Sequence, residues 1–487
     1  MADGAILAID EGTTNAKAVM VALDGAILAT GSAPLAITHP RPGWVEQDAD
    51  AIWDATRHAV SDCLAQAGGV QPVAIGVSNQ RESVLIWDRR TGQPLGPVIT
   101  WQCRRTADVC AALREAGHEP DVIARTGLPL DPLFPATKAR WLLDHHAPAG
   151  GEPLIGTVDS WLIWKLTGGA VHATDCSNAS RTQLLDLALG DWDRDLCGLF
   201  GIDPAMLPAI HDSAHVYGRT DGVDGLPDGV PVASAIGDSH AALFAHGAFA
   251  PGSAKATFGT GSSVMIPLDA FAPPPPGITT TIAWSLEGRS TYALEGNILV
   301  SASILPWTAA LLGLDDVDAV LALADTVSDA GGVSLVPAHV GLGSPHWVPD
   351  ARGLIDGLTF GVGPAQITRA AVDSIALQVC DVLAAMENAA PPVARLSADG
   401  GPSRNRALMG RVADLSGRNV APCAAGEASA MGAAYLAGLA IGLWPDLNAI
   451  AAMVRHDDPI PPAMGTAERT AALDRWRKAV ARAARPS

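Results

Sequence analysis

The opening of the chain alternates short apolar runs with turn residues. Apolar stretches cover 5–9, 18–23 and 26–29, and the pair Asp24-Gly25 separates the second run from the third. Asp-Gly is typical of a tight hairpin turn, because both central residues of that turn need a positive φ. We therefore predict a three-stranded meander, with Asp10 at the end of its first strand and a Gly12-Thr13-Thr14 turn after it.

Helix and strand patterns alternate in the segments that follow. Ile52, Thr56, Val60 and Leu64 recur at helical spacing, and Asp48 can cap the start of that helix. The strands predicted next are 73–77, 83–87 and 98–101, and further helices are predicted at 160–166 and 428–440. This alternation predicts an α/β fold whose first sheet is partly antiparallel.

A second Gly-Thr turn near the middle of the chain repeats the first one. A predicted strand at 255–258 leads into Gly259-Thr260-Gly261, and another strand follows at 264–266. Successive backbone amides in such turns form an anion-binding concavity. We therefore predict two similar domains, residues 1–247 and 248–487, that face each other across a cleft and converge on a polyphosphate.

Composition narrows the classes of function. A chain of 487 residues exceeds one hydrophobic core, so two domains are expected. A formal charge of −19 argues against binding to nucleic acid or to anionic membranes. The seven cysteines form no CxxC pair, the start lacks a signal-peptide pattern, and no apolar run approaches the roughly 20 residues of a membrane helix. We expect a cytoplasmic protein without membrane insertion.

The segment 79–82 and Trp101 predict a small-polyol pocket. Arg81 offers forked donors and Glu82 offers acceptors, and a row of hydroxyls can satisfy both together. A surface ion pair is the alternative interpretation.

Asp238 is the candidate catalytic acid. It ends the apolar run 231–236 and precedes a predicted helix at 239–246, so its carboxylate is expected to project into the cleft. There it could accept a proton from a substrate hydroxyl that attacks a terminal phosphoryl group, whereas the alternative is simple helix capping. Asp10 either makes local hydrogen bonds or, with Asp238, holds Mg²⁺ partly through water.

A third glycine turn predicts the nucleoside end of the site. A strand at 396–399 ends in Gly400-Gly401, and a helix is expected to begin near Asn405. The glycines admit a flat ring, and Asn405 can read a purine edge or a ribose. A plain Asp-Gly-Gly loop explains the pattern equally well.

Taken in order, these segments resemble the FGGY carbohydrate kinases, and among them the glycerol kinases. The resemblance covers nearly the whole chain and rests on the segments 10–14, 78–82, 99–106, 156–166, 178–182, 237–238, 259–261, 341–343, 351–353 and 399–401. It implies two ribonuclease-H-like domains, of the actin and hexokinase ATPase type, that close on MgATP and a small polyol. Relatives are often homodimers or homotetramers.

The resemblance also implies roles for individual residues. Asp238 is then the general base, Arg81 and Glu82 hold the polyol hydroxyls, and Trp101 packs on its carbon skeleton. The ATP-binding positions are Thr13, Thr14, Asn15, Lys17, Thr260, Ala302, Gly401 and Asn405.

Several positions depart from the glycerol kinase pattern. Leu133 stands where a tyrosine is usual, Ser239 replaces a glutamine and Ser263 replaces an aromatic residue, so the polyol pocket is expected to be roomier. On the nucleotide side, Lys17 replaces an arginine, Glu11 and Pro306 each replace a glutamine, and Ala302 replaces a glycine. The segment 221–230 lacks the Gly-x-Arg loop that binds fructose 1,6-bisphosphate in some relatives, so that regulation is not expected.

We therefore expect an ATP-dependent kinase that converts glycerol to glycerol 3-phosphate. The alternative within the family is another polyol or a ketose, such as erythritol, threitol, xylulose or ribulose. An actin-like or chaperone-like ATPase acting on protein partners is a second alternative, but the polyol pocket argues against it. A sugar-sensing regulator would need a helix-turn-helix and a basic face.

Overall fold

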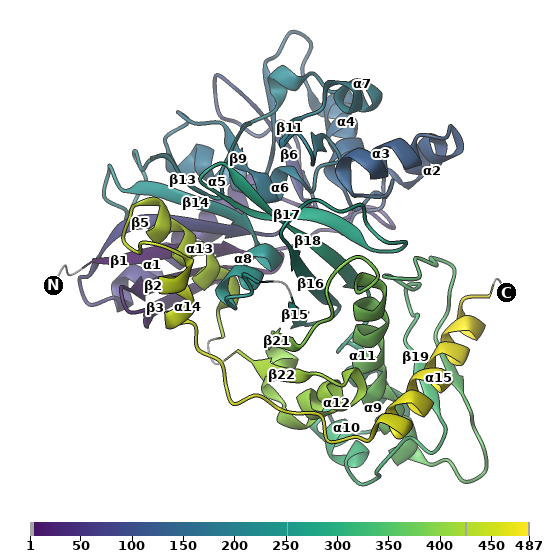
Figure 1. The fold of residues 1–487 in the computed structure, drawn as a ribbon. Helices are drawn as coiled ribbons and strands as arrows, with labels where there is room; N and C mark the ends of the chain where they lie inside the picture. Colours follow the sequence, from purple (N-terminus) through teal and green to yellow (C-terminus); the bar gives the residue numbers. More distant parts are fainter. Residues whose placement is uncertain (1–3, 251, 424–425, 486–487) are drawn as a thin grey trace.

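The computed structural model describes residues 4–250, 252–423 and 426–485. Two six-stranded sheets form its centre (Figure 1). The first has the order β13-β14-β5-β1-β2-β3. Its strands are β1 (Gly4–Glu11), β2 (Asn15–Ala22), β3 (Ile27–Pro34), β5 (Gln71–Asn79), β13 (Ala214–Arg219) and β14 (Pro231–Gly237).

The second sheet repeats the arrangement of the first. Its order is β17-β18-β16-β15-β21-β22. Its strands are β15 (Ser253–Phe258), β16 (Ser262–Leu268), β17 (Thr279–Leu286), β18 (Arg289–Ile298), β21 (Arg395–Asp399) and β22 (Asn419–Pro422). In both sheets the first strand pairs antiparallel with a hairpin partner and parallel with the strand on its other side. The predicted meander, the Asp24-Gly25 turn and the two similar α/β units are thus confirmed.

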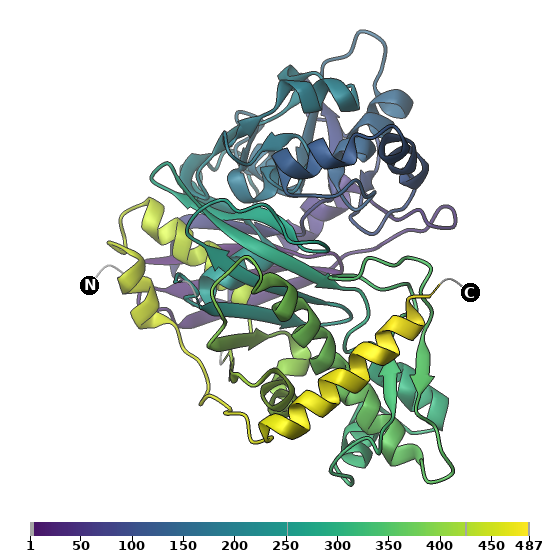
Figure 2. The same ribbon diagram turned by 45° about the vertical axis from the view of Figure 1, so that its right-hand side comes forward.

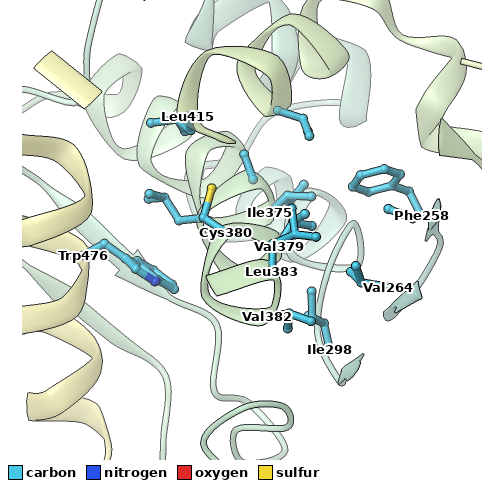
Figure 3. Close-up of a cluster of buried hydrophobic side chains, with 14 of the residues drawn as sticks. Phe258, Val264, Ile298, Ile375, Val379, Cys380, Val382, Leu383, Leu415 and Trp476 are labelled. Carbon is cyan, nitrogen blue, oxygen red and sulfur yellow. The ribbon is translucent and has the colours of Figure 1, made fainter. Parts of the chain in front are cut away.

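Helices cover the faces of both sheets. Helix α1 (Ala49–Gln66) packs on β2 and β3, and the Asp48 side chain accepts hydrogen bonds from Asp50 and Ala51 as predicted. In the second half, α11 (Pro364–Met386) forms a core with the sheet, with α12 (Arg406–Ser416) and with α15 (Thr466–Ala483). Figure 3 shows Ile375, Val379 and Leu383 of α11 facing this core, with Trp476 on the other side.

Helix α13 (Ala428–Ala440) belongs to the second half in sequence but packs on the first sheet. It lies against β1, β5 and β14 and against α8 (Asp238–Ala245), as Figures 1 and 2 show at the N-terminal side. The approach is close, since a Cβ at Gly432 would lie 2.0 Å from the Ala241 carbonyl oxygen and one at Gly76 would lie 2.4 Å from that of Ala433. The small residues of the segment therefore serve dense packing.

A separate four-stranded sheet belongs to the first half of the chain, and its strand β6 lies above the first six-stranded sheet in Figure 1. It has the order β4-β7-β6-β8, with β4 (Glu46–Gln47), β6 (Val84–Asp88), β7 (Val98–Ile99) and β8 (Pro153–Thr157). The strands predicted at 83–87 and 98–101 thus exist, but the sequence did not indicate that they form their own sheet. Helices α2 (Ala107–Glu115), α3 (Glu119–Thr126), α4 (Pro135–His146), α5 (Val158–Leu166) and α7 (Arg194–Phe200) belong to the same region.

The remaining elements are short. They are β9 (Ala173–Asp175), α6 (Cys176–Ala179), β10 (Leu185–Asp186), β11 (Asp191–Trp192), η1 (Pro204–Met206), β12 (Ala209–His211), α9 (Ile304–Leu312), α10 (Val317–Ala324), β19 (Ser334–Val336), β20 (Leu354–Asp356), η2 (Gly401–Arg404) and α14 (Leu447–Met453). Within the described ranges, no helix combines the length and the apolar character needed to cross a bilayer.

Candidate active site

The ends of two parallel strands bring the predicted polyol-binding residues and the candidate catalytic acid together. Strands β5 and β14 run side by side with Asn79 opposite Gly237, so the residues after each strand meet at one edge of the sheet. Arg81 Nε lies 3.1 Å from Asp238 Oδ1, and Arg81 Nη1 lies 4.0 Å from Glu82 Oε1. The side chains of Arg81 and Glu82 are only 8% and 7% exposed, so the surface ion pair considered from sequence is wrong.

Asp238 is the first residue of α8 and not its N-cap. Gly237 occupies the N-cap position, and the Asp238 side chain is 39% exposed. A Cβ at Gly237 would lie 2.6 Å from Cγ and Cδ of Arg81, so the missing side chain leaves room for the arginine stem. Asp238 Oδ1 accepts a hydrogen bond from the backbone N–H of Ser239 at 2.6 Å.

Buried ion pairs hold Arg81 and Glu82 in place. The acid at the centre of this network, Glu295, is not among the site residues predicted from sequence. Glu295 on β18 is fully buried, with Oε1 2.8 Å from Arg81 Nη1 and Oε2 2.9 Å from Arg181 Nη1. Arg181 Nε in turn donates to Glu82 Oε1 at 2.6 Å. Burial alone would raise the pKa of Glu295, but Arg181 and Arg81 outweigh it and hold that pKa well below its usual range. Glu295 therefore holds the guanidinium of Arg81, and Arg181 holds the carboxylate of Glu82.

The three departures from the family pattern occupy different places around this network. Ser263 donates to Glu295 Oε1 at 3.0 Å, which puts its hydroxyl beside the arginine pair. Leu133 lies in the loop before α4, where its backbone N–H donates to Asp131. All three side chains, Ser239 included, are half-buried.

The first Gly-Thr turn contacts Trp101, which belongs to the predicted polyol pocket. Trp101 Nε1 donates to Thr13 Oγ1 at 2.9 Å, and the Thr13 carbonyl accepts from Gln47 Nε2. Thr14 and Asn15 are exposed at the tip of the turn. The indole predicted to carry the polyol skeleton is therefore oriented by the turn predicted to hold phosphates.

Lys17 faces the second half of the chain. Its Nζ lies 2.8 Å from Glu427 Oε2, just before α13. A polar cavity of about 320 Å³ borders this pair and is lined also by Thr30, Asp62 and Gln66.

Two acidic residues at the end of β1, the partly buried Asp10 and the fully buried Glu11, share a crowded negative environment. Burial, followed by repulsion from Asp238, raises the pKa of Asp10 to about 6. Burial also raises the pKa of Glu11 to about 8, although Gln80 donates to Glu11 Oε1 at 3.1 Å. Among the described residues there is no group of three or more acidic, histidine or cysteine side chains placed to hold a metal ion. Asp10 and Asp238 together suit a cation whose other ligands are water and phosphate oxygens.

The second Gly-Thr turn and the nucleoside positions gather in the second half. The Thr260 carbonyl accepts from Ser301 N, and the Ala302 N–H donates to the Gly259 carbonyl. A Cβ at Gly400 would lie 2.0 Å from the Phe258 carbonyl oxygen, so the glycine admits the turn beside β15. Gly401 follows it and is exposed.

Asn405 is engaged in a way that sequence reasoning did not anticipate. Its Oδ1 accepts from Leu408 N, so it caps α12. Nearer the start of the Gly400-Gly401 turn, Nε2 of His246, the residue that follows α8, lies 2.7 Å from Asp399 Oδ2. The helix that begins at Asp238 is thereby tied to the strand that leads to Gly401.

Arg181 and Glu295 are thus the residues that sequence reasoning missed. Arg181 lies in the segment 178–182 that resembles the family, but neither its residue type nor its spacing indicates a role. Glu295 interrupts the buried stretch 293–296 of β18, and a lone acid inside such a stretch was the available signal, since unpaired buried charges are rare.

The chain matches known families over most of its length. A model described as "FGGY family of carbohydrate kinases, N-terminal domain" matches residues 5–245, and its C-terminal counterpart matches 254–441. An apulose kinase of Pectobacterium atrosepticum is 46% identical over 98% of both chains. A glycerol kinase of Aromatoleum aromaticum is 44% identical, also over 98% of both. The crystal structure of Plasmodium falciparum glycerol kinase with ADP aligns over 99% of both chains with a TM-score of 0.93 and 29% identity.

Proposed function

Because the chain belongs to the FGGY family of carbohydrate kinases and is an ATP-dependent sugar or polyol kinase, we propose that its acceptor is glycerol and its product glycerol 3-phosphate. The observation that carries the proposal is the buried Arg81-Glu82 pair beside the partly exposed carboxylate of Asp238. The full-length similarity to glycerol kinases supports the same choice.

In the proposed reaction Asp238 acts as the general base. Its carboxylate takes the proton from a terminal hydroxyl as that oxygen forms a bond to the γ-phosphorus of ATP and the bond to the β–γ bridging oxygen breaks. Arg81 holds one oxygen of Asp238 at 3.1 Å, which leaves the carboxylate oriented for the incoming hydroxyl. ADP and the phosphorylated acceptor are the products.

The acceptor is proposed to lie between Arg81, Glu82 and Trp101. The guanidinium donates to hydroxyl oxygens, the Glu82 carboxylate accepts from hydroxyl hydrogens, and the indole covers the carbon skeleton. Leu133, Ser239 and Ser263 would form the rest of the wall. Closure of the two halves would exclude water, so that the acceptor rather than water receives the phosphoryl group.

The nucleotide is proposed to span both halves of the chain. Thr13, Thr14, Asn15 and Lys17 would bind its phosphates from the first half, and Thr260, Ala302, Gly401 and Asn405 would bind it from the second. Asp10 and Asp238 would hold Mg²⁺, which neutralises phosphoryl charge when bound. The raised pKa of Asp10, which burial and then repulsion from Asp238 cause, supports this placement, because a bound cation would offset both effects.

A longer or branched acceptor is the second candidate. Leu133 and Ser263 are smaller or less polar than the side chains expected for a glycerol pocket, and a relative at 46% identity is an apulose kinase. Erythritol, threitol, xylulose and ribulose therefore compete with glycerol.

A screen of acceptors tests the proposal. ADP release is measured with ATP and Mg²⁺ for glycerol, erythritol, threitol, xylulose and ribulose, and kcat/KM values are compared. The highest value for glycerol supports the proposal, and a four- or five-carbon preference replaces it with the second candidate. ATP consumption that no acceptor increases would point to an ATPase instead.

The role of Asp238 is tested by the substitution Asp238→Asn. We expect turnover to fall roughly 10²–10⁴-fold because the base is lost, while ATP affinity stays close to that of the wild type. Asp315→Asn, at an exposed position, is the matched control. Near-normal turnover of the Asp238→Asn variant would contradict the assignment.

Two further features belong to the proposal. The domain division at 1–247 and 248–487 is supported by the two sheets and by matches that end at 245 and begin at 254. A cytoplasmic location is supported by Cys63, Cys103, Cys110, Cys176, Cys197 and Cys380, which are buried and free of disulfides.

A further inference from the structure

A fully buried lysine lies behind the acceptor pocket. Lys138 is on α4, and its Nζ donates to the carbonyl oxygens of Glu82 at 2.7 Å, Leu133 at 2.7 Å and Thr100 at 3.2 Å. Its exposure is 0%. None of the roles proposed above uses this residue.

The three carbonyls belong to three separate segments that carry the acceptor residues. Glu82 follows β5, Thr100 precedes Trp101, and Leu133 precedes α4. In sequence, Lys138 lies 56 positions after Glu82, 38 after Thr100 and five after Leu133. One ammonium group thus joins all three.

The chemistry of the ammonium fits this junction. A lysine ammonium has three N–H donors and no acceptor, and it faces three backbone carbonyl acceptors. At Glu82 the backbone has a φ of 61°, a left-handed conformation that is unfavourable for a residue with a side chain. The carbonyl that accepts from Lys138 at 2.7 Å thus belongs to a residue in this unfavourable conformation.

A buried charge at this place has a cost that packing alone does not explain. Burial lowers the pKa of Lys138 to about 7, and the nearby Glu82 carboxylate opposes that shift. An apolar side chain of similar length would fill the same space without the desolvation penalty. The Glu82 and Leu133 carbonyls, however, would then lose the ammonium as a donor, while the Thr100 carbonyl would keep only the N–H of Cys103.

We propose that Lys138 is a positioning residue that sets the mutual placement of Glu82, Trp101 and Leu133 around the acceptor. The inference rests on the proposed function, because it concerns the pocket of that reaction. Lys138 touches none of the reacting atoms. It acts through the backbone of the three segments, so its loss affects the acceptor rather than ATP.

The test uses two substitutions and one control in the full chain. Lys138→Met keeps the length and removes the donors, and Lys138→Gln keeps two N–H donors on a shorter side chain without the charge. Leu142→Ala is the control, because Leu142 is also fully buried on α4 but is part of the apolar cluster of that region. KM for ATP, KM for the best acceptor of the five-compound screen and kcat are measured for each variant.

The expected result is a split between the two substrates. In Lys138→Met the acceptor KM rises about ten- to hundredfold while the ATP KM changes less than about threefold, and Lys138→Gln lies between that variant and the wild type. Leu142→Ala lowers the melting temperature without this split. At an acceptor concentration near the wild-type KM, acceptor also raises the melting temperature of Lys138→Met much less than that of the wild type, whereas ATP raises both alike.

Different outcomes separate the two claims. Wild-type transfer to none of the five acceptors overturns the proposed function and the inference together. Wild-type transfer with an unchanged acceptor KM in Lys138→Met, or equal changes in both KM values, overturns the inference alone. If Lys138→Met does not fold, the acceptor KM of Lys138→Gln decides in the same way.

Discussion

Replacement of Glu295 by glutamine tests whether the buried ion network sustains the acceptor site. Glu295→Gln keeps the shape of the side chain but removes the charge shared by Arg81 and Arg181. An amide presents one acceptor oxygen, and its NH₂ group would face a guanidinium donor. We therefore expect one charge-assisted contact to be lost and the other to weaken.

The magnitude follows from the contacts of Glu295. A hydrogen bond to a charged group contributes about 1.5–3 kcal/mol, and breaking a buried ion pair costs about 3–5 kcal/mol. Arg81 keeps Asp238 and Arg181 keeps Glu82, so the loss should lie at the lower end. The share that falls on Arg81, about 1.5–3 kcal/mol, corresponds to a loss of about ten- to 150-fold in kcat/KM for the acceptor.

The assay couples ADP release to NADH oxidation and varies acceptor and ATP separately. Glu287→Gln is the matched control, because Glu287 lies in the exposed turn between β17 and β18. We expect the control to retain wild-type kcat/KM and the ATP KM of both variants to stay near that of the wild type. An acceptor kcat/KM within about threefold of the wild type in Glu295→Gln would refute the reasoning.

Two further substitutions test other contacts. Glu427→Gln removes the partner of Lys17, so we expect the ATP KM at low salt to fall about two- to fivefold as the ammonium becomes available to phosphates; a rise would contradict this. Burial lowers the pKa of His172 to about 4 in the folded chain, so the unfolded chain binds the proton first and stability falls as pH drops from about 6.5 towards 4. The glutamine of His172→Gln can still donate to the Ile155 carbonyl but does not titrate. Between pH 7.5 and 5, the unfolding free energy measured with urea should therefore fall by about 1–2 kcal/mol less in this variant than in the wild type. Equal falls would contradict the assignment.

Much of the fold could be predicted because local signals and global topology agree. The Asp24-Gly25 turn, the Asp48 cap and the strand that ends before Asp238 each carry their own conformational signature, and the structure contains all three. The separate sheet β4-β7-β6-β8 could not be predicted, because β4 and β7 are two residues long and pair across distant parts of the chain.

The candidate site shows the same limit. Arg81 and Asp238 could be singled out because a charged residue at the end of an apolar strand is visible in sequence. The contact of Arg81 with Glu295 and that of Glu82 with Lys138 could not, because each joins residues more than fifty positions apart. Residue types suggest chemistry, but distances between segments decide which groups act on one another.

The placement of α13 has a consequence for how the protein forms during synthesis. The first sheet is made early, yet the helix that covers one of its faces lies at Ala428–Ala440, near the end of the chain. Domains commonly fold as they leave the ribosome, N-terminal part first. Here the N-terminal half must wait with an apolar face uncovered until the second sheet and then α13 have been synthesised, so nascent chains should depend on chaperones for that interval.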